Sequence, residues 1–356
     1  MKNLLKFSIS LFLLIFLIIL ICSCEKGRAG NMLNYNGQSG YRIMFWNTEN
    51  LFDYLNDSIS DDNEFLPGSI RHWTKERYQT KLLKVYKTIL AAGIQKPPEI
   101  IGLCEIENSK VLFDLLKETP LSYFKYRFVH HESPDRRGID VALLYDPSSI
   151  KIIEEHPIPV DLYAAGGGTT RDILYVRAGF SSGDTISIFV NHWPSKYGGA
   201  GTTENFRRIT AEKLRNSVKE LQMKFLTEKI VIMGDFNDPP ESRSISVHLG
   251  SEKPGEIIQG NLLYNLSETK AGDIRGTLKY EGMWELMDQF IVNGNSLNEK
   301  TGLHTGSRFF QIFSPDFLFK DDDVYGGRKP FRTWNGMKYQ GGFSDHLPVI
   351  LNLISK

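Results

Sequence analysis

The chain has 356 residues, with 42 basic and 42 acidic side chains and a formal net charge of zero. This balance argues against a broad basic surface for nucleic acid, although it leaves room for a local one. The chain contains 3 cysteines, two of them near the N-terminus, which excludes a framework of disulfides. No internal repeat or second change of composition interrupts the chain after residue 41, so one large domain is the simplest division.

The first residues have the pattern of an export signal. Two lysines precede an apolar run over residues 11–21, which is short for a membrane-spanning helix. Ser23-Cys24 resembles a bacterial lipobox, which predicts a lipoprotein signal over residues 1–24 with Cys24 as the lipidated residue. Cys22 fits less well because an isoleucine precedes it, and an uncleaved N-terminal anchor is the alternative. We therefore expect an exported protein held on a bacterial membrane, in the periplasm or at the cell surface.

Residues 25–40 are polar and rich in glycine, which predicts a flexible tether between the lipid and a folded domain over residues 41–356. After removal of the signal, Cys104 would be the cysteine left in that domain. It lies within an apolar run and is expected to be a small core residue.

Apolar runs and helical periodicities alternate along the domain. We predict strands over residues 41–46, 100–104, 141–145, 185–190, 229–233, 284–292 and 348–354. We predict helices over residues 74–92, 109–117 and 205–225. Thr74 is placed to cap the first helix and Gly93 to end it. Many apolar strands with a few strong helices indicate an α/β sandwich with a large sheet core.

Several of these strands end in, or follow, polar residues that can bind a metal. The segments are Asn47-Thr48-Glu49-Asn50, Glu105-Ile106-Glu107-Asn108, Asn191-His192-Trp193-Pro194, Gly234-Asp235-Phe236-Asn237-Asp238 and Ser344-Asp345-His346. The pattern predicts one polar cavity at one rim of the sheet. Carboxylates and amides with little sulfur favour a hard cation, Mg²⁺ first and Mn²⁺ or Ca²⁺ as alternatives. Together with two histidines, such a site suits hydrolysis of a phosphate ester.

These motifs resemble those of the endonuclease/exonuclease/phosphatase superfamily, which includes pancreatic-type deoxyribonuclease, apurinic/apyrimidinic endonucleases, neutral sphingomyelinases and inositol polyphosphate 5-phosphatases. The matching residues are, in order, Trp46-Asn47, Glu105, His192, Gly234-Asp235-Phe236-Asn237, Asp288 and Ser344-Asp345-His346. The likeness extends over residues 41–354. The residues around each motif resemble those of secreted bacterial nuclease-like members. It implies a four-layer α/β/β/α sandwich with two packed mixed sheets.

The resemblance also implies roles for individual residues. Glu105 would hold the metal directly with Asn47 beside it, and Asp345 would complete the shell of the metal or of its water. Asp235 would orient or deprotonate the attacking water, and Asn237 would bind the phosphate.

His346 would contact the phosphate or act as base, with its tautomer fixed by Asp288. His192 would serve as acid or phosphate donor on the opposite side. The family assigns base and acid differently among its branches, so these two roles stay open. Arg171 occupies a place where family members carry an arginine that contacts phosphate, and an ordinary surface arginine is the alternative.

Other polar residues admit a functional and a structural interpretation. Asp140 either pairs with a catalytic histidine or simply begins a strand. Arg207 and Arg208 fit a solvated helix face better than a phosphate contact. His130-His131-Glu132 looks like a metal motif, but adjacent histidines seldom share a site, so a loop is expected. Glu49-Asn50 either supports the metal site or belongs to an ordinary strand end.

The segment over residues 296–342 interleaves basic and aromatic side chains. This composition suits a lid that grips phosphate and stacks on a base. The acidic run Asp321-Asp322-Asp323 argues in the opposite direction. We expect the segment to set substrate choice.

The leading interpretation is a metal-dependent endonuclease outside the cytoplasm, with nucleic acid as substrate, a lipid anchor in the membrane and no partner subunit. The alternative is an inositol-phosphate phosphatase or a sphingomyelinase-like phosphodiesterase, since a lipid-tethered enzyme meets such substrates. A non-catalytic binding domain is disfavoured, because the metal carboxylate, both histidines and the Asp/Asn pair are all present.

Overall fold

The structure is a computed structural model that describes residues 40–57, 61–94, 96–196, 199–267 and 275–356. The predicted signal, Cys24 and the tether up to residue 39 lie outside these residues. Within the described ranges, no helix is long and apolar enough to cross a membrane.

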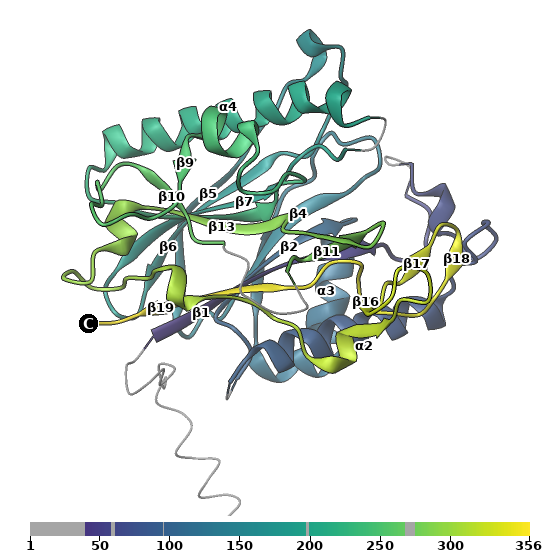
Figure 1. Cartoon of the computed structure of the whole chain (residues 1–356). Helices are drawn as coiled ribbons and strands as arrows, with labels where there is room; N and C mark the ends of the chain where they lie inside the picture. The colour runs from purple at the N-terminus through teal and green to yellow at the C-terminus, as the bar shows by residue number, and fades with distance from the viewer. Residues whose placement is uncertain (1–39, 58–60, 95, 197–198, 268–274) are drawn as a thin grey trace, which may run out of the picture.

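Two mixed sheets form the centre of the domain (Figure 1). The first sheet has six strands in the order β14 (Phe310–Ile312), β19 (Val349–Ile354), β1 (Gly40–Leu51), β2 (Ile100–Ile106), β4 (Asp140–Tyr145) and β3 (Arg127–His130). The second has seven in the order β5 (Ile150–Ile158), β6 (Ile173–Phe180), β7 (Thr185–His192), β8 (Lys229–Asp235), β13 (Asp288–Asn293), β10 (Leu263–Asn265) and β9 (Ser251–Glu252). β1 joins β2 in parallel and β19 in antiparallel orientation.

Smaller elements surround the sheets. Three hairpins consist of β11 (Leu278–Tyr280) with β12 (Met283–Glu285), β15 (Phe319–Asp321) with β16 (Arg328–Pro330), and β17 (Trp334–Asn335) with β18 (Lys338–Tyr339). The short helical turns are η1 (Asn63–Phe65), η2 (Pro120–Phe124), η3 (Tyr163–Ala165), η4 (Ser244–Leu249), η5 (Gly294–Leu297), η6 (Ser307–Phe309) and η7 (Asp316–Leu318).

Three long helices cover the outer faces of the sheets, with α4 (Ala200–Lys224) on one side and α2 (Lys75–Ala92) and α3 (Ser109–Lys117) on the other (Figure 1). The predicted first helix is confirmed, because the Thr74 side chain accepts a hydrogen bond from the N–H of Arg77 and Gly93 follows the last turn. α4 begins earlier than predicted, and the predicted strand over residues 284–292 is divided between β12 and β13.

Three apolar clusters fill the spaces between these layers. The first sheet packs against α2 and α3 through residues such as Leu103 and Val85. The two sheets pack against each other through residues such as Phe45 and Met233. The second sheet packs against α4 through residues such as Ile232. This arrangement confirms the predicted four-layer sandwich of helices, two sheets and helices.

The basic and aromatic segment is not the stacking lid that its composition suggested. Trp334 is 3% exposed and packs on Trp73, with ring centroids 5.4 Å apart. Lys329 is neutralised by Asp322 at 2.9 Å, a member of the acidic run. A buried indole has no free face for a base, so the lid prediction is wrong for Trp334. The physical reason is that the segment packs into the apolar layer beside α2 and does not line an open edge of the site.

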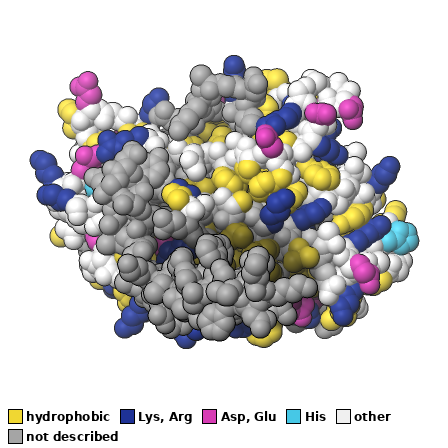
Figure 2. Space-filling model, turned by 90° about the horizontal axis from the view of Figure 1, so that it is seen from below, with side chains coloured by type: hydrophobic (Ala, Val, Ile, Leu, Met, Phe, Trp, Pro, Cys, Tyr) yellow, Lys and Arg dark blue, Asp and Glu magenta, His cyan; other side chains and the backbone are white. Residues whose placement is uncertain are grey.

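The outer face of α2 combines apolar and basic side chains. Leu83 and Leu90 are exposed on it. Where grey atoms do not cover it, the face of the molecule seen from below shows apolar side chains interspersed with Lys and Arg (Figure 2). Lys84 and Lys87 each lie over the ring of Phe343, at 5.3 and 5.7 Å from its centroid. These lysines tie the segment before Ser344 to the helix layer.

Candidate active site

The first group of site residues forms one row across the second sheet. β7 and β8 are parallel with His192 opposite Asp235, and β8 and β13 are antiparallel with Asp235 opposite Asp288. Along β8, Val231 and Met233 face the first sheet, and side-chain alternation sends Asp235 to the same side. The three polar side chains are therefore neighbours because their strands reach the rim at the same level.

The first sheet contributes Asn47 by the same alternation. Ile43 and Phe45 face the second sheet, and Asn47 is the next inward position on β1. Its Nδ2 donates to Asp235 Oδ2 at 3.0 Å, and its Oδ1 accepts from the N–H of Glu49 at 2.9 Å. Asn47 thus joins the two sheets by a hydrogen bond at the rim.

Glu105 reaches the rim through an irregularity in β2. Cys104 faces inward, so a regular strand would turn Glu105 toward the helices. The pairing of β2 with β4 shifts register between Cys104 and Ile106, and Glu105 adopts a left-handed φ of 60°. Bulges of this kind redirect a side chain. The Glu105 Oε2 accepts from the N–H of Asn50 at 2.8 Å, and its Oε1 lies 3.9 Å from His192 Nε2.

Four non-glycine residues at this rim have a positive φ: Glu49 (52°), Asn50 (55°), Glu105 (60°) and Asn237 (51°). Such conformations cost about 1–3 kcal/mol each and persist where the surroundings impose them, most often at functional sites. Their concentration here supports a functional rim.

The Ser344-Asp345-His346 motif locks the last strand to the first. Ser344 Oγ donates to the Asn47 carbonyl at 2.7 Å and accepts from the N–H of His346 at 3.0 Å. His346 Nδ1 donates to Asp288 Oδ2 at 2.7 Å, and its Nε2 lies 3.8 Å from Asp235 Oδ2. The predicted pairing of His346 with Asp288 is present in the structure.

The two histidines have opposite electrostatic surroundings. Burial would lower the pKa of His346, but the carboxylates of Asp288 and Asp235 outweigh it and raise that pKa well above the ordinary value. Burial lowers the pKa of His192 well below the ordinary value, and Arg171 and Arg137 lower it further. His346 is therefore a cation at neutral pH, whereas His192 is a neutral imidazole.

Asp235 lies between these histidines, with its Oδ2 3.7 Å from His192 Nε2. Burial raises the pKa of Asp235 to about 6, against the lowering effect of His346. Its Oδ1 accepts from the N–H of Asn237 at 3.0 Å. The carboxylate is thus held in place and has a proton affinity close to neutral pH, as a general base requires.

The donor set fits a hard divalent cation. Asp235, Asp288 and His346 offer atoms that lie within 4.8 Å of one another, and because the His346 imidazolium has no lone pair for an ion, the carboxylate oxygens are the ligands of this group. Asp288 Oδ1 is buried and has no hydrogen-bond partner among the described residues. Glu105 and Asn47 add a carboxylate and an amide oxygen at the same rim. Buried carboxylate oxygens in excess of local cations favour binding of Mg²⁺ or a similar ion.

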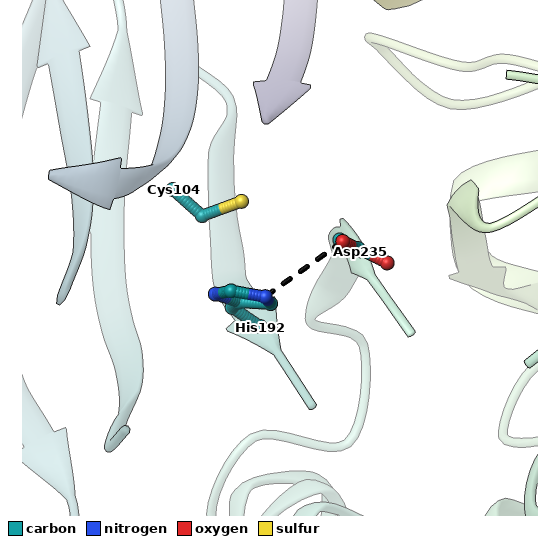
Figure 3. A group of neighbouring side chains, drawn as sticks. All are labelled: Cys104, His192 and Asp235. Carbon is teal, nitrogen blue, oxygen red and sulfur yellow. Dashed lines mark ion pairs between the residues drawn. The ribbon is translucent and has the colours of Figure 1, made fainter. Parts of the chain in front are cut away.

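Cys104 lies beside this group but is a poor ligand. Figure 3 shows its side chain close to His192 and Asp235, with the contact between the latter two marked. Burial raises the pKa of the Cys104 thiol well above the ordinary value, and the carboxylates of Asp235 and Glu105 raise it further. The thiol therefore stays protonated. Its place in the core between the sheets confirms the sequence prediction.

Three predicted site residues are engaged by protein groups. Asn237 Nδ2 donates to the Trp193 carbonyl at 3.0 Å. Arg171 is buried and donates to the same carbonyl at 2.7 Å and to Asp135 at 3.0 Å. Asp345 pairs with Arg332 at 2.8 Å. We therefore keep as predictions that Asn237 and Arg171 contact phosphate and that Asp345 binds the metal. In the structure, Arg171 and Asp345 contact protein groups that support the rim.

Two of the weaker patterns have clear outcomes. Arg207 is 2% exposed and bonds to Asp238 at 2.7 Å, so the expected solvated helix face is wrong for this residue. Arg208 does pair with Glu212 along the helix surface, as expected. Asp140 contacts His130 rather than His192 or His346.

Arg137 is a candidate functional residue that the sequence reasoning did not single out. Its guanidinium donates to Asn50 Oδ1 at 3.1 Å and lies 4.0 Å from Glu105 Oε1. In the sequence, the Arg136-Arg137-Gly138 turn just before β4 is the pattern that could have pointed to Arg137. A cavity of about 670 Å³ begins at Asn50 and Arg137. Its wall includes Asp61, Glu64, Phe65 and Arg71, Leu162 with residues 168–171, and Pro194, Ser195, Thr203 and Phe206.

Glu49 and Lys81 are a second pair of buried charges near the site. The sequence suggested a supporting role for Glu49 but did not indicate Lys81. Glu49 accepts from the N–H of Thr333 and from that of Trp334, the latter at 2.9 Å. Lys81 is 1% exposed and donates to Thr333 Oγ1 at 2.5 Å and to the Phe343 carbonyl at 2.6 Å. Both charges thus hold the 328–343 segment against the strand that carries Asn47.

Comparison with known proteins decides the family. A family model described as "Endonuclease/Exonuclease/phosphatase family" matches residues 42–355. The chain belongs to this family. A search of curated proteins found no match.

Solved structures of the family share the fold. An endonuclease/exonuclease/phosphatase family protein from Bacteroides thetaiotaomicron is 14% identical, with a TM-score of 0.57 over 90% of this chain and 99% of that one. A mannosyl-6-phosphatase from the same organism is also 14% identical, with a TM-score of 0.51 over 88% and 99%. The D. rerio TDP2 complexed with a single-strand DNA product gives 14% identity and a TM-score of 0.51 over 88% and 99%.

Membership in the endonuclease/exonuclease/phosphatase family confirms the resemblance seen in the sequence motifs. Enzymes of this family hydrolyse phosphate esters with the help of a divalent metal, and the rim residues of this chain supply a matching set of oxygen and imidazole groups.

Proposed function

We propose that the protein is a metal-dependent endonuclease that acts outside the cytoplasm on phosphodiester bonds of nucleic acid. The cavity of about 670 Å³ beside the rim supports this proposal. A volume in this range accommodates a nucleotide-sized group beyond the reacting phosphate. Arg137, 52% exposed at the mouth, offers a cation to the next phosphate of a strand.

Each rim residue has a task in this reaction. His192 is neutral at neutral pH, so of the two roles predicted for it, acid or phosphate donor, the phosphate donor is the one that fits. Protonated His346 donates its Nε2–H to a phosphate oxygen, and Asp288 fixes its orientation. Asp235 takes the proton of the attacking water, while Asn47 and Asn237 hold its carboxylate. As the water oxygen bonds to phosphorus, the bond from phosphorus to the leaving oxygen breaks, and that oxygen leaves as an alkoxide that takes a proton from solvent. Glu105 and Asn47 would hold the divalent ion, which supplies positive charge against the charge that builds up on the phosphate.

A phosphatase of inositol phosphates or a sphingomyelinase-like enzyme is the second candidate. The cavity wall includes Asp61 and Glu64 beside Arg71, and Glu64 pairs with Arg71 at 2.9 Å. Mixed charges of this kind suit the hydroxyl groups of a polyol better than a run of phosphates. One neighbour carries a DNA product and another is a sugar phosphatase, so the fold accommodates both classes.

Parallel assays with the full-length chain distinguish these candidates. Supercoiled plasmid, single-stranded RNA, sphingomyelin and inositol phosphates are incubated with Mg²⁺ or with chelator, and His346→Ala serves as the inactive control. Metal-dependent plasmid nicking that the control lacks would support the endonuclease. Release of phosphate or phosphocholine with intact nucleic acid would support the second candidate. The absence of hydrolysis with every substrate would contradict both candidate functions.

We further propose that Cys24 carries a lipid that holds the enzyme on the outer side of the cytoplasmic membrane or at the cell surface. Metabolic labelling with an alkynyl fatty acid tests this. The label is expected on the wild type and on the matched control Cys22→Ser, and it should be absent from Cys24→Ser. Equal labelling of Cys24→Ser would contradict the proposal.

A further inference from the structure

A second group of ligand-forming side chains lies at the junction of β3 and β4. One ligand atom each of His130, Glu132 and Asp140 lie within 4.8 Å of one another. The side chains of His130 and Asp140 are only 1% and 2% exposed, whereas that of Glu132 is 64% exposed. The group is therefore a buried pair with one carboxylate at the solvent edge, which leaves a route for an ion.

The two carboxylates are close enough for a cation between them to reduce their repulsion. One oxygen of Glu132 and one of Asp140 lie within 4.8 Å of each other, so the two negative charges repel when both groups are ionised. A bound cation removes this conflict at neutral pH. In the described ranges the ion-pair partner of both carboxylates is His130, whose Nδ1 lies 3.9 Å from Glu132 Oε1 and whose Nε2 lies 3.1 Å from Asp140 Oδ2. The exposed Glu132 side chain would turn from Nδ1 toward Nε2 to join an ion bound there.

The geometry at His130 matches ligation through Nε2. This nitrogen lies 3.1 Å from Asp140 Oδ2. Two ligands that each bind Zn²⁺ at about 2.0–2.2 Å in tetrahedral geometry lie about 3.3–3.5 Å apart, so the spacing needs little change. Asp140 Oδ1 already accepts from the N–H of Ser133 at 2.9 Å, which leaves Oδ2 for an ion.

The other ring nitrogen has the partner that a ligating histidine needs. Ser109 Oγ lies 3.0 Å from His130 Nδ1 and either donates or accepts, depending on the tautomer. When Nε2 binds an ion, Nδ1 carries the proton and donates to Ser109, so the change of tautomer requires no net gain or loss of protons at His130. Histidines that bind metals usually donate their second N–H in this way.

We propose that His130, Glu132 and Asp140 bind a transition-metal divalent cation, Zn²⁺ being the best fit. One imidazole and two carboxylates suit Zn²⁺ or Mn²⁺, whereas Mg²⁺ and Ca²⁺ favour sites built from oxygen alone. His131 does not belong to the site, because its ring contacts Glu155 on β5. The expected loop is confirmed for His131 and Glu132, whereas His130 is the last residue of β3, and the fold brings His130 and Glu132 together with Asp140.

An ion at this position would close the loop of residues 131–139 at both ends. Within that loop, Asp135 holds Arg171 at 3.0 Å, and Arg137 holds Asn50 at 3.1 Å. The ion would therefore stabilise the loop that supports the rim, at a site separate from the reacting groups.

Zn²⁺ titration of the full-length chain tests the proposal, with excess Mg²⁺ present and a chromophoric chelator as competitor. Glu132→Gln removes one ligand charge at an exposed position, and His131→Gln is the matched control one residue away. We expect Glu132→Gln to weaken one Zn²⁺ site by about tenfold or more, and His131→Gln to bind as the wild type does. Both variants leave the rim residues intact, so Zn²⁺ bound at the rim cancels in the comparison.

Thermal unfolding gives a readout independent of activity. Zn²⁺ should raise the unfolding midpoint of the wild type and of His131→Gln more than that of Glu132→Gln. Equal affinities and equal midpoint shifts in Glu132→Gln and His131→Gln would overturn the proposal, as would the absence of a Zn²⁺ site that depends on Glu132. Asp140→Asn, checked for folding by circular dichroism, should lose the same site.

Discussion

Replacing Asp288 with asparagine tests whether the charge of the His346 imidazolium is used in the reaction. The substitution keeps the size of the side chain and an oxygen that can accept from His346 Nδ1, but removes the carboxylate charge 2.7 Å from that nitrogen. The carboxylate also helps to raise the pKa of His346. Asp288→Asn therefore lowers the fraction of protonated His346 and its interaction with a phosphate.

The expected magnitude follows from the geometry. Opposite charges about 4 Å apart attract by about 4 kcal/mol at an effective dielectric constant of about 20. Because the amide oxygen keeps a hydrogen bond, we expect a loss of about 2–3 kcal/mol. This corresponds to a decrease in kcat/KM of about 30- to 150-fold. The alkaline limb of the pH profile should also move to lower pH, because the pKa of His346 falls.

The assay is hydrolysis of a chromogenic phosphodiester such as bis(p-nitrophenyl) phosphate with saturating Mg²⁺ over a range of pH. Asp184→Asn is the control, since it removes the same charge from a pair with Lys229, 2.6 Å apart, away from the rim. A kcat/KM for Asp288→Asn within about threefold of the control, with an unchanged alkaline limb, would refute the role given to His346.

Three further outcomes are expected. Glu105→Gln should raise the Mg²⁺ concentration for half-maximal activity by about tenfold or more, and an unchanged metal titration would contradict metal binding by Glu105. Lys81→Met leaves the buried Glu49 with one cation fewer, so the free energy of unfolding in urea should fall by about 3 kcal/mol, and a fall below about 1 kcal/mol would count against the buried network. Burial opposes ionisation of Asp184, but hydrogen bonds from Lys229 and neighbouring groups outweigh it and depress the pKa of Asp184, so its stabilising contribution is present at neutral pH and is lost as the pH falls below about 4. Asp184→Asn should accordingly be less stable than the wild type at pH 7, and the difference should shrink on acidification, whereas a constant difference would contradict this assignment.

The alternation of inward-facing and outward-facing residues along each strand explains why the sequence predicted much of the site. In β8, the alternation of Val231 and Met233 with outward residues continues directly into Asp235. The same rule applies to Phe45 and Asn47 in β1. Local periodicity therefore identifies which polar residues end an inward row. Asp288 was found through the family motif, because no local pattern shows that β13 pairs with β8.

The features that the sequence did not predict depend on partners that are far away along the chain. Arg207 is buried because Asp238 lies against it across α4 and the end of β8. Trp334 is buried where its backbone N–H donates to Glu49, 285 positions away, and its ring packs on Trp73. Composition alone cannot distinguish an arginine or tryptophan that meets such a partner from one that faces solvent. Tertiary contacts, rather than propensity, decided these positions.

The close approach of the two sheets makes the rim a single site rather than two halves. A Cβ atom at Gly102 of β2 would lie only 2.7 Å from the end of Met233 and 3.1 Å from the ring of Phe45. Met233 stands one inward position before Asp235, and Phe45 stands one inward position before Asn47. The absence of a side chain at Gly102 therefore lets the sheets meet just below the rim, where the Asn47–Asp235 hydrogen bond of 3.0 Å joins them. Since cores of this density deform little, the distance between Glu105 on one sheet and the His192–Asp235–Asp288 row on the other is set by packing before any ion or substrate arrives.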